Sequence, residues 1–319
     1  MSEISNPDIF GNSVEDKKST EVSIYADEIQ VVEDFSTSER WIYMGAIYEK
    51  INDPILEDLI NIRYKKDLPD WEKYFQKNDA NIHWHEIKDS LDRKHIVNRW
   101  LKYIYDDCLI SRKIYFSLLG INIDNLNTEE FDYNQNFNSI YNRFFRSMLG
   151  FSLKKFFGEN VTVKNIFHEE GQQMYHEYFE WHPIFRLNQD KYLNFQCDKI
   201  EFLPKSHRDD KRSNIIQLCD TLLGIFKDLH LGIDAGSYPK YKKEILDSEF
   251  VQSFFIKRLI RQPDNLRSRF SYHKRFNLSL FPKRKSEIGS LERRMNNYYE
   301  ISAIKLNYEE NKNQNRLFD

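Results

Sequence analysis

The feature that most constrains this chain is a short apolar segment near its N-terminus that runs into two adjacent carboxylates. Residues 22–28 read Val-Ser-Ile-Tyr-Ala-Asp-Glu, so β-branched and aromatic residues lead directly to Asp27 and Glu28. Such a run is typical of a buried strand, in whose middle an unpartnered carboxylate pair would be costly to bury. At the end of a strand the pair is tolerated and can bind a divalent cation. We therefore expect later segments to bring further acids to this strand end.

Strand-like and helix-like patterns mix through residues 22–230, which predicts an α/β fold with helices on the faces of a sheet. Strands are expected at residues 22–28, 41–48, 112–123, 161–167 and 199–203, and helices at 53–62, 89–107, 137–156, 172–186 and 213–226. The short connection between the first two strands favours an antiparallel hairpin. Asp53 is expected to cap the first helix, with Pro54 at its first position, and Gly158 is expected to end the third.

The chain is expected to divide into three parts. Residues 1–20 are polar and predict a loose N-terminal arm, residues 21–237 hold the α/β domain, and residues 238–319 form a basic, mainly helical extension. Aromatic rings are interleaved with the basic residues of this extension, so its cations are candidates for contact with a nucleic-acid backbone. The candidates are Lys257, Arg258, Arg261, Lys274, Arg275, Lys283 and Arg284. The alternatives are that the rings pack on the core while the charges are solvated, or that the rings form a protein interface.

Composition narrows the class of protein. The net charge of −3 gives no strong overall attraction for nucleic acid, so only a local concentration of charge would provide one. Cys108, Cys197 and Cys219 are odd in number and far apart, which favours a reducing, cytoplasmic location. No membrane partner is expected, because no apolar run approaches the roughly 18 residues of a membrane span. With only 10 glycines, no phosphate-binding glycine loop and no G-x-S-x-G elbow, nucleotide-cofactor and serine-hydrolase chemistry are disfavoured.

Acids stand at four places where a predicted strand or helix ends or faces a cleft. They are Asp27 with Glu28, Glu86, Glu169 with Glu170, and Asp220. Carboxylates gathered in this way suit two Mg²⁺ or Mn²⁺ ions, which together stabilise the attacking and leaving oxygens of a phosphodiester. The alternative is that these acids are salt-bridged surface groups, as most of the 50 Asp and Glu residues must be.

Two neighbours of Asp220 share its face of the predicted helix. Gln217 lies three residues before Asp220 and Gly224 lies four residues after it. A glycine at that place is expected to let the helix approach the sheet closely, at some cost in helix stability.

Four segments in order resemble a known family. They are residues 24–28, 85–88, 200–206 and 216–224, the last reading Ile-Gln-Leu-Cys-Asp-Thr-Leu-Leu-Gly. They are similar to the prokaryotic domain-of-unknown-function family numbered three thousand eight hundred, whose closing helix reads Leu-Gln-x-Ala-Asp-x-x-x-Gly. The resemblance covers about residues 22–230. The chain departs from the family pattern at Ile29-Gln30, where Ser-Gly is usual, at Cys219, where Ala is usual, and at His168, where an Asp is expected nearby.

The resemblance implies a ribonuclease H-like fold and a metal-dependent nuclease. It places Asp27 on the first strand and Asp220 on the last helix, two positions that carry metal in that fold. Glu86 matches the family's acid before Ile/Leu-Lys, and Glu169 or Glu170 matches its acid after the fourth strand. The alternative function is an inactive scaffold that binds nucleic acid, DNA or RNA, or a protein partner. Families of this kind resemble components of mobile elements and antiphage systems, which suggests a defence role by analogy.

Other polar residues near these acids have candidate roles. His85 or His168 is a candidate general base, and Lys205 is a candidate phosphate contact. His83 with His85, or His168 with His176, would be a zinc pair, but neither has a well-spaced third ligand. The expected cofactor is therefore Mg²⁺ or Mn²⁺, and a homo-oligomer remains an open alternative.

Overall fold

The first strand pairs on both sides, which makes it an inner strand of a mixed sheet. In the computed structural model, β1 (Thr20–Glu33) runs antiparallel to β2 (Arg40–Lys50) and parallel to β4 (Val161–Glu169). Residues 22–27 of β1 are buried, as their apolar run predicts. The structure describes residues 19–34, 37–65, 79–126, 137–158, 160–231, 239–260 and 272–282. Most of the predicted N-terminal arm lies outside these ranges.

The remaining strands extend the sheet on both sides of this centre. The strand order is β5 (Leu193–Phe195), β4, β1, β2, β3 (Ile114–Asn122) and β7 (Phe276–Phe281), and β6 (Glu201–Leu203) also pairs with β4. β2 and β3 are antiparallel, whereas β3 with β7, and β4 with both β5 and β6, are parallel. The α/β prediction and the antiparallel hairpin are therefore confirmed.

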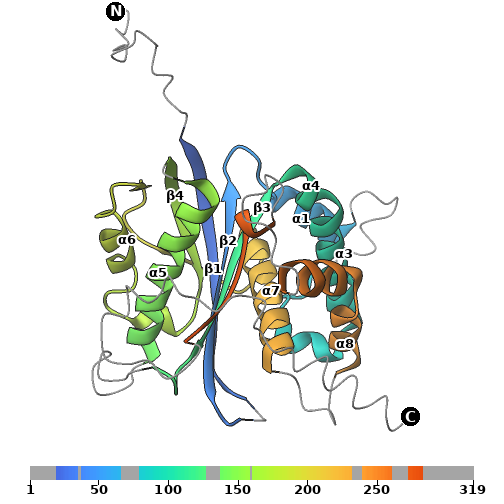
Figure 1. The fold of residues 1–319 in the computed structure, drawn as a ribbon. Coiled ribbons are helices and arrows are strands. Elements are labelled where there is room, and N and C mark those ends of the chain that lie inside the picture. Colours follow the sequence, from blue (N-terminus) through green and yellow to red (C-terminus); the bar gives the residue numbers. More distant parts are fainter. Residues whose placement is uncertain are drawn as a thin grey trace, which may run out of the picture.

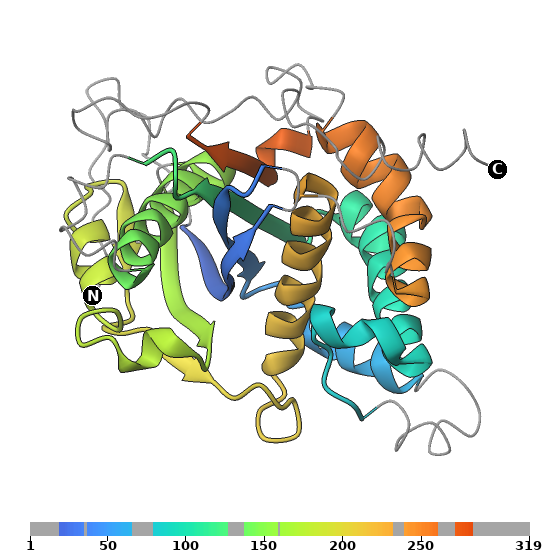
Figure 2. The same cartoon turned by 90° about the horizontal axis from the view of Figure 1, so that it is seen from below.

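Helices cover both faces of the sheet (Figures 1 and 2). α5 (Phe137–Phe157) and α6 (His182–Leu187) lie on one face, while α7 (Ser213–Leu231) lies against β1 and β2 on the other. α1 (Leu56–Tyr64), α3 (Leu91–Tyr103) and α8 (Lys240–Leu246) pack outside α7. Each face has its own cluster of buried apolar side chains. None of the described helices has the length and apolar character to cross a bilayer.

Five short helical segments and one helix of 11 residues, η5, complete the described chain. They are η1 (Trp84–Asp89), η2 (Ile104–Cys108), α4 (Leu109–Ser111), η4 (Gln172–Tyr175), η5 (Phe250–Ile260) and η6 (Tyr272–Lys274).

Three predicted helix boundaries are wrong, each because of a local contact. α1 begins at Leu56 rather than at Asp53, because the Glu49 carboxylate of β2 accepts the Ile55 N–H at 2.7 Å. The helix expected from residue 89 begins after Ser90, whose hydroxyl accepts the Arg93 N–H at 3.3 Å. The helix expected at residues 172–186 is replaced by η4 and α6. Pro183 has no N–H to donate to a preceding turn, so it stands at the start of α6.

The C-terminal part is not only a helical extension, which corrects the prediction. β7 pairs with β3 and so belongs to the same sheet. Phe254, Phe255 and Phe276, three of the interleaved rings, are fully buried in the core on the α7 face. The alternative in which the aromatic rings pack on the core therefore holds for these residues.

Two glycines allow other elements to pack closely against α7. Gly45 allows the sheet to do so, and Gly224 allows η1 to do so. A Cβ at Gly45 of β2 would lie 3.1 Å from Sγ of Cys219 on α7, so Gly45 brings helix and sheet together. A Cβ at Gly224 would lie 2.1 Å from Cγ of Trp84. The expectation that Gly224 faces the sheet is therefore wrong, because Gly224 makes room for the Trp84 ring of η1 instead.

Replacing Gly224 with alanine should displace Trp84 and destabilise the fold. Overpacking of this kind typically costs about 1–3 kcal/mol, more than the roughly 1 kcal/mol that alanine gains over glycine in a helix. Gly150→Ala in α5 is the matched control, because its Cβ would meet only the terminal Cδ2 methyl of Leu187, at 2.9 Å. Urea unfolding should show a loss of stability for Gly224→Ala alone. Equal effects of the two variants would contradict the assigned role of Gly224.

Candidate active site

Four of the predicted acids, Asp27, Glu28, Glu169 and Asp220, line one recess where the pairing of β1 with β4 ends. β1 itself continues to Glu33, so the expectation that Asp27 and Glu28 end the strand is wrong. The parallel register pairs Ala26 with His168, so the next residues, Asp27 and Glu169, follow on neighbouring strands. Asp220 reaches the same recess from α7, and the hollow has a volume of about 490 Å³. Segments that are far apart in the sequence thus bring Asp27, Glu169 and Asp220 together.

Burial and mutual repulsion make these carboxylates costly to ionise. Burial raises the pKa of Asp27 well above its ordinary value, and the charges of Glu169 and Asp220 raise it further. Burial and then Asp220 raise the pKa of Glu169, whereas Lys205 and His83 lower it. The recess is therefore a place where positive charge is stabilised.

Two cationic side chains face Glu169 inside the recess. Nζ of Lys205 lies 3.4 Å from Oε2 of Glu169. Nδ1 of His83 lies 3.6 Å from Oδ2 of Asp220 and 3.8 Å from Oε1 of Glu169. Burial lowers the pKa of His83, but the hydrogen bond and attraction of Asp220, together with Glu169, outweigh that effect and raise it overall. Protonation of His83 is thus easier than that of a free histidine.

Polar side chains of α7 position the segments that carry these cations. Oε1 of Gln217 accepts the Ile82 N–H at 3.1 Å, and Nε2 of Gln217 donates to the Lys205 carbonyl at 2.9 Å. Oδ2 of Asp220 accepts the Trp84 N–H at 2.8 Å. The helix therefore holds the backbone on both sides of His83 as well as that of Lys205.

Glu28 and His168 form a buried polar pair beside the acids. Nδ1 of His168 donates to the Glu169 carbonyl at 2.8 Å, which leaves Nε2 to accept from the Tyr141 hydroxyl at 2.7 Å. Burial lowers the pKa of His168 to about 4, so this ring is neutral. Oε2 of Glu28 lies 3.4 Å from Nε2 of His168, and burial raises the pKa of Glu28 to about 7. Both ring nitrogens of His168 therefore form hydrogen bonds within the protein, and the ring holds the end of β4 in place.

The other predicted site residues do not join the three acids. Oε2 of Glu86 lies 2.8 Å from Nη2 of Arg93, and Glu86 does not line the recess. Glu170 also lies outside it, and its backbone N–H is bonded to the Leu203 carbonyl. His85 lies on the rim with a side chain that is 79% exposed. The structure thus separates Glu86, Glu170 and His85 from the carboxylates that converge.

Two further lysines of the recess were missed in the sequence. Lys227 of α7 and Lys242 of α8 line the recess, and Lys227 forms an ion pair with the buried Asp228. Nζ of Lys242 lies 5.0 Å from the centre of the Trp84 ring. Lys227 follows Asp220 by seven residues, which is two helical turns, so helical spacing offered a signal for it. Lys242 comes from a segment whose position no local pattern reveals.

The donor set of the recess suits a hard divalent cation. Its acids offer only oxygen donors, and Oε1 of Glu169 is buried without a hydrogen-bond partner. Within the described ranges, however, no three histidine, cysteine, aspartate or glutamate side chains already form a group that could hold a metal ion. An ion would therefore draw the acids closer and replace part of the charge that Lys205 and His83 supply.

The predicted nucleic-acid contacts have mixed positions. Lys257, Arg258 and Lys274 are exposed, and Arg258 donates to the Tyr272 hydroxyl at 3.0 Å. Arg275 is only 9% exposed and donates to the Leu109 carbonyl at 3.1 Å, so it is turned into the protein. Arg261, Lys283 and Arg284 lie outside the described residues.

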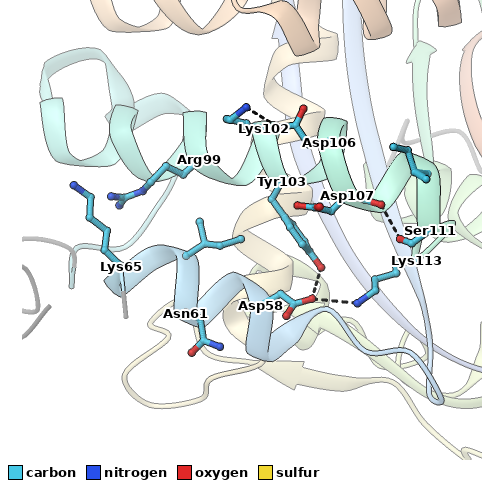
Figure 3. Close-up of a pocket in the computed structure, with 12 residues that line it drawn as sticks. Asp58, Asn61, Lys65, Arg99, Lys102, Tyr103, Asp106, Asp107, Ser111 and Lys113 are labelled. Carbon is cyan, nitrogen blue, oxygen red and sulfur yellow. Dashed lines mark hydrogen bonds and ion pairs between the residues drawn. The ribbon is translucent and has the colours of Figure 1, made fainter. Parts of the chain in front are cut away.

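A larger hollow, of about 920 Å³, lies between α1 and the α3–α4 segment (Figure 3). Its charged groups largely satisfy one another. Asp58 accepts a hydrogen bond from Tyr103 and lies 3.4 Å from Nζ of Lys113, and Lys102 pairs with Asp106 at 2.5 Å. The candidate site is accordingly assigned to the smaller recess with its converging acids.

Asp27→Asn should stabilise the metal-free protein at neutral pH. A carboxyl whose pKa is raised by folding destabilises the folded state as it ionises, so the cost is absent below its unfolded pKa of about 4 and grows as the pH rises. We expect the variant to gain about 1–2 kcal/mol, seen as a melting temperature a few degrees higher in EDTA. The gain should shrink on acidification to about pH 5.

Asp106→Asn is the matched control for this measurement. Asp106 is exposed and pairs with Lys102, so the Asp106→Asn variant should show no gain in stability at either pH. A melting temperature of Asp27→Asn below that of the wild type at neutral pH would contradict the repulsion assigned to the three acids.

The comparisons with known proteins add no relative to this picture. The chain matches no family model, and no curated protein matches its sequence. The case for a function therefore depends on the fold and on the geometry of the recess.

Proposed function

We propose that the protein is a divalent-metal-dependent nuclease that hydrolyses phosphodiester bonds at the recess formed by Asp27, Glu169 and Asp220. The observation that carries this proposal is the meeting of the buried Asp27 of β1 with the largely buried Glu169 of β4 and Asp220 of α7, beside Lys205 and His83. Acids brought together at such a cost in electrostatic repulsion are typical of a site that binds cations.

The topology supports a ribonuclease H-like fold for this nuclease. Three antiparallel strands, β1 to β3, are followed by β4, which lies parallel to β1 on its other side. One acid stands on the first strand and another on a helix that packs against it, as the family resemblance implies. The parallel pairing of β1 with β4 brings Asp27 and Glu169 to neighbouring positions on adjacent strands.

Asp27, Glu169 and Asp220 would hold the ion, with Glu28 close behind them. A bound Mg²⁺ or Mn²⁺ would supply Lewis acidity at phosphorus and lower the pKa of the attacking water. A pair of ions would need at least one more oxygen ligand, and the second carboxylate of the Asp27-Glu28 pair is the nearest candidate in sequence.

The chain's own cations have separate roles in this proposal. The Lys205 side chain is 58% exposed, so its ammonium group can bind a phosphate oxygen while it stays near Glu169. Nδ1 of His83 lies between two carboxylates that raise the pKa of its ring, so His83 is the group placed to exchange a proton with the bound substrate. Lys227, which lines the recess, would attract neighbouring phosphates, whereas Lys242 is largely buried, with its Nζ 3.9 Å from Oδ2 of Asp228.

A second function is favoured by one observation. Lys205 and His83 already neutralise part of the acidic charge, and no three-ligand metal group is formed among the described residues. This is what an accessory protein would show if it bound nucleic acid or a protein partner without turnover. Nucleic acid as the partner is itself part of the proposal, and DNA and RNA are equally compatible with it.

Purified protein should cleave single-stranded DNA or RNA when Mn²⁺ is added and should not cleave it in EDTA. Asp27→Asn should lower the cleavage rate on the order of 100-fold or more, because it removes an ion ligand. Asp106→Asn, at the exposed Lys102 pair, should cleave like the wild type. Cleavage is followed by gel electrophoresis of end-labelled strands.

Titration calorimetry with Mn²⁺ separates the two functions. The nuclease requires Mn²⁺ binding that Asp27→Asn removes, whereas the accessory protein requires none. Metal-dependent cleavage that survives in Asp27→Asn would rule out the proposed site.

A further inference from the structure

The segment that follows Glu169 and Glu170 is anchored to the site and turns its aromatic rings outward. Gly171 lines the recess, and Gln173 is fully buried, with its side chain close enough to Glu28 to lower the pKa of that carboxyl. Phe179 is also fully buried, with its ring centre 5.3 Å from that of His168. The inward residues thus fix residues 171–187 against the strand end.

Four rings on the outer side of this segment are exposed, and we call them the aromatic strip. Their exposed fractions are 83% for Tyr175, 50% for Tyr178, 44% for Trp181 and 55% for Phe185. The ring centres of Tyr178 and Trp181 are 6.1 Å apart, and those of Trp181 and Phe185 are 6.2 Å apart. Across the described ranges, every large aromatic side chain that is exposed belongs to this strip. A gathered set of exposed rings marks an interaction surface rather than chance exposure.

Cationic groups border the strip. Arg146 of α5 and Arg186 of α6 are close enough to His182 to lower its pKa, after the effect of burial. Glu177, between Tyr175 and Tyr178 in the sequence, adds one negative charge beside the strip, and its hydrogen bond with the Tyr178 hydroxyl raises the pKa of that tyrosine. These arginines therefore lie near the strip, because the His182 ring packs against that of Trp181, with the ring centres 5.8 Å apart.

We propose that the aromatic strip binds single-stranded nucleic acid by stacking on its bases and leads the strand to the recess. Exposed rings beside cations are the usual means by which proteins bind single strands, because every base offers a face for stacking. A duplex hides those faces within its own stack, so it cannot use the strip in the same way. Gly171 of the recess is four residues from Tyr175, the first ring of the strip, and this short connection to the proposed phosphodiester site favours nucleic acid over a protein partner.

This inference rests on the proposed nuclease function and names its substrate class. Its test uses binding in EDTA, so that it does not depend on cleavage. A labelled oligothymidine strand is titrated by fluorescence anisotropy against the wild type, Trp181→Leu, Tyr178→Leu and Trp181→Phe. Leucine keeps apolar surface but removes the ring, whereas phenylalanine keeps a ring. Ile110→Ala is the control for an exposed apolar residue elsewhere, because Ile110 is 83% exposed.

The two leucine variants should each weaken binding about 10-fold, and Trp181→Phe and Ile110→Ala should bind nearly as the wild type does. The matching duplex should bind more weakly than the single strand. Circular dichroism checks that each variant is folded. Unchanged binding by the leucine variants, no binding by the wild type, or equal binding of the duplex would each overturn the proposal.

Two further outcomes separate this inference from the proposed function. Ring-dependent binding without metal-dependent cleavage would refute the nuclease and leave the strip as a single-strand site. If the leucine variants cleave as the wild type does, the result would support the nuclease and overturn the role proposed for the aromatic strip. Loss of self-association in the leucine variants, with nucleic-acid binding retained, would instead identify the strip as a protein interface and would also overturn the proposal.

Discussion

The structure depends most on the repulsion among three carboxylates where the pairing of β1 with β4 ends, and on the groups that offset it. Asp27, Glu169 and Asp220 line one recess, and both strand acids have pKa values raised by burial and by their neighbours. Left uncompensated, such a group of acids would oppose folding. His83 and Lys205 provide the offset from outside the sheet, and each lies within 4 Å of a carboxylate oxygen.

α7 connects this electrostatic balance to the fold. Its apolar residues pack against β1 and β2, while Gln217 and Asp220 hold the backbone near His83, Trp84 and Lys205. Gly224 leaves space for the Trp84 ring, and the Nε1–H of Trp84 donates to the buried Asp228 at 2.7 Å. One helix therefore supplies an acid of the recess and also positions the cations that neutralise it. A change in the packing of α7 would alter the charge balance as well as the stability.

Local sequence patterns predicted the strand that carries Asp27 and the helix that carries Asp220. The apolar run into Asp27 identified the inner strand, and the pattern around Asp220 placed that acid on a helix. Glu86 lies within the 3₁₀ helix η1 and meets Arg93, a contact that no spacing rule distinguishes from a position in the recess. The sequence predicts His83 only as half of a possible zinc pair. Its contacts with Glu169 and Asp220 were not predicted, because both acids are distant from it in the sequence. The strand β7 was missed because its basic and aromatic surroundings suggested helix, whereas its pairing with β3 is a long-range contact.

The most direct test of the central claim is a crystal structure of the protein soaked in Mn²⁺, with the ion located by its anomalous scattering. The proposed site predicts Mn²⁺ bound by carboxylate oxygens of Asp27, Glu169 and Asp220 at about 2.1 Å, with Lys205 displaced from Glu169. Mn²⁺ found only at surface acids, with the Lys205–Glu169 pair intact, would contradict the claim that these three carboxylates form a metal-binding active site.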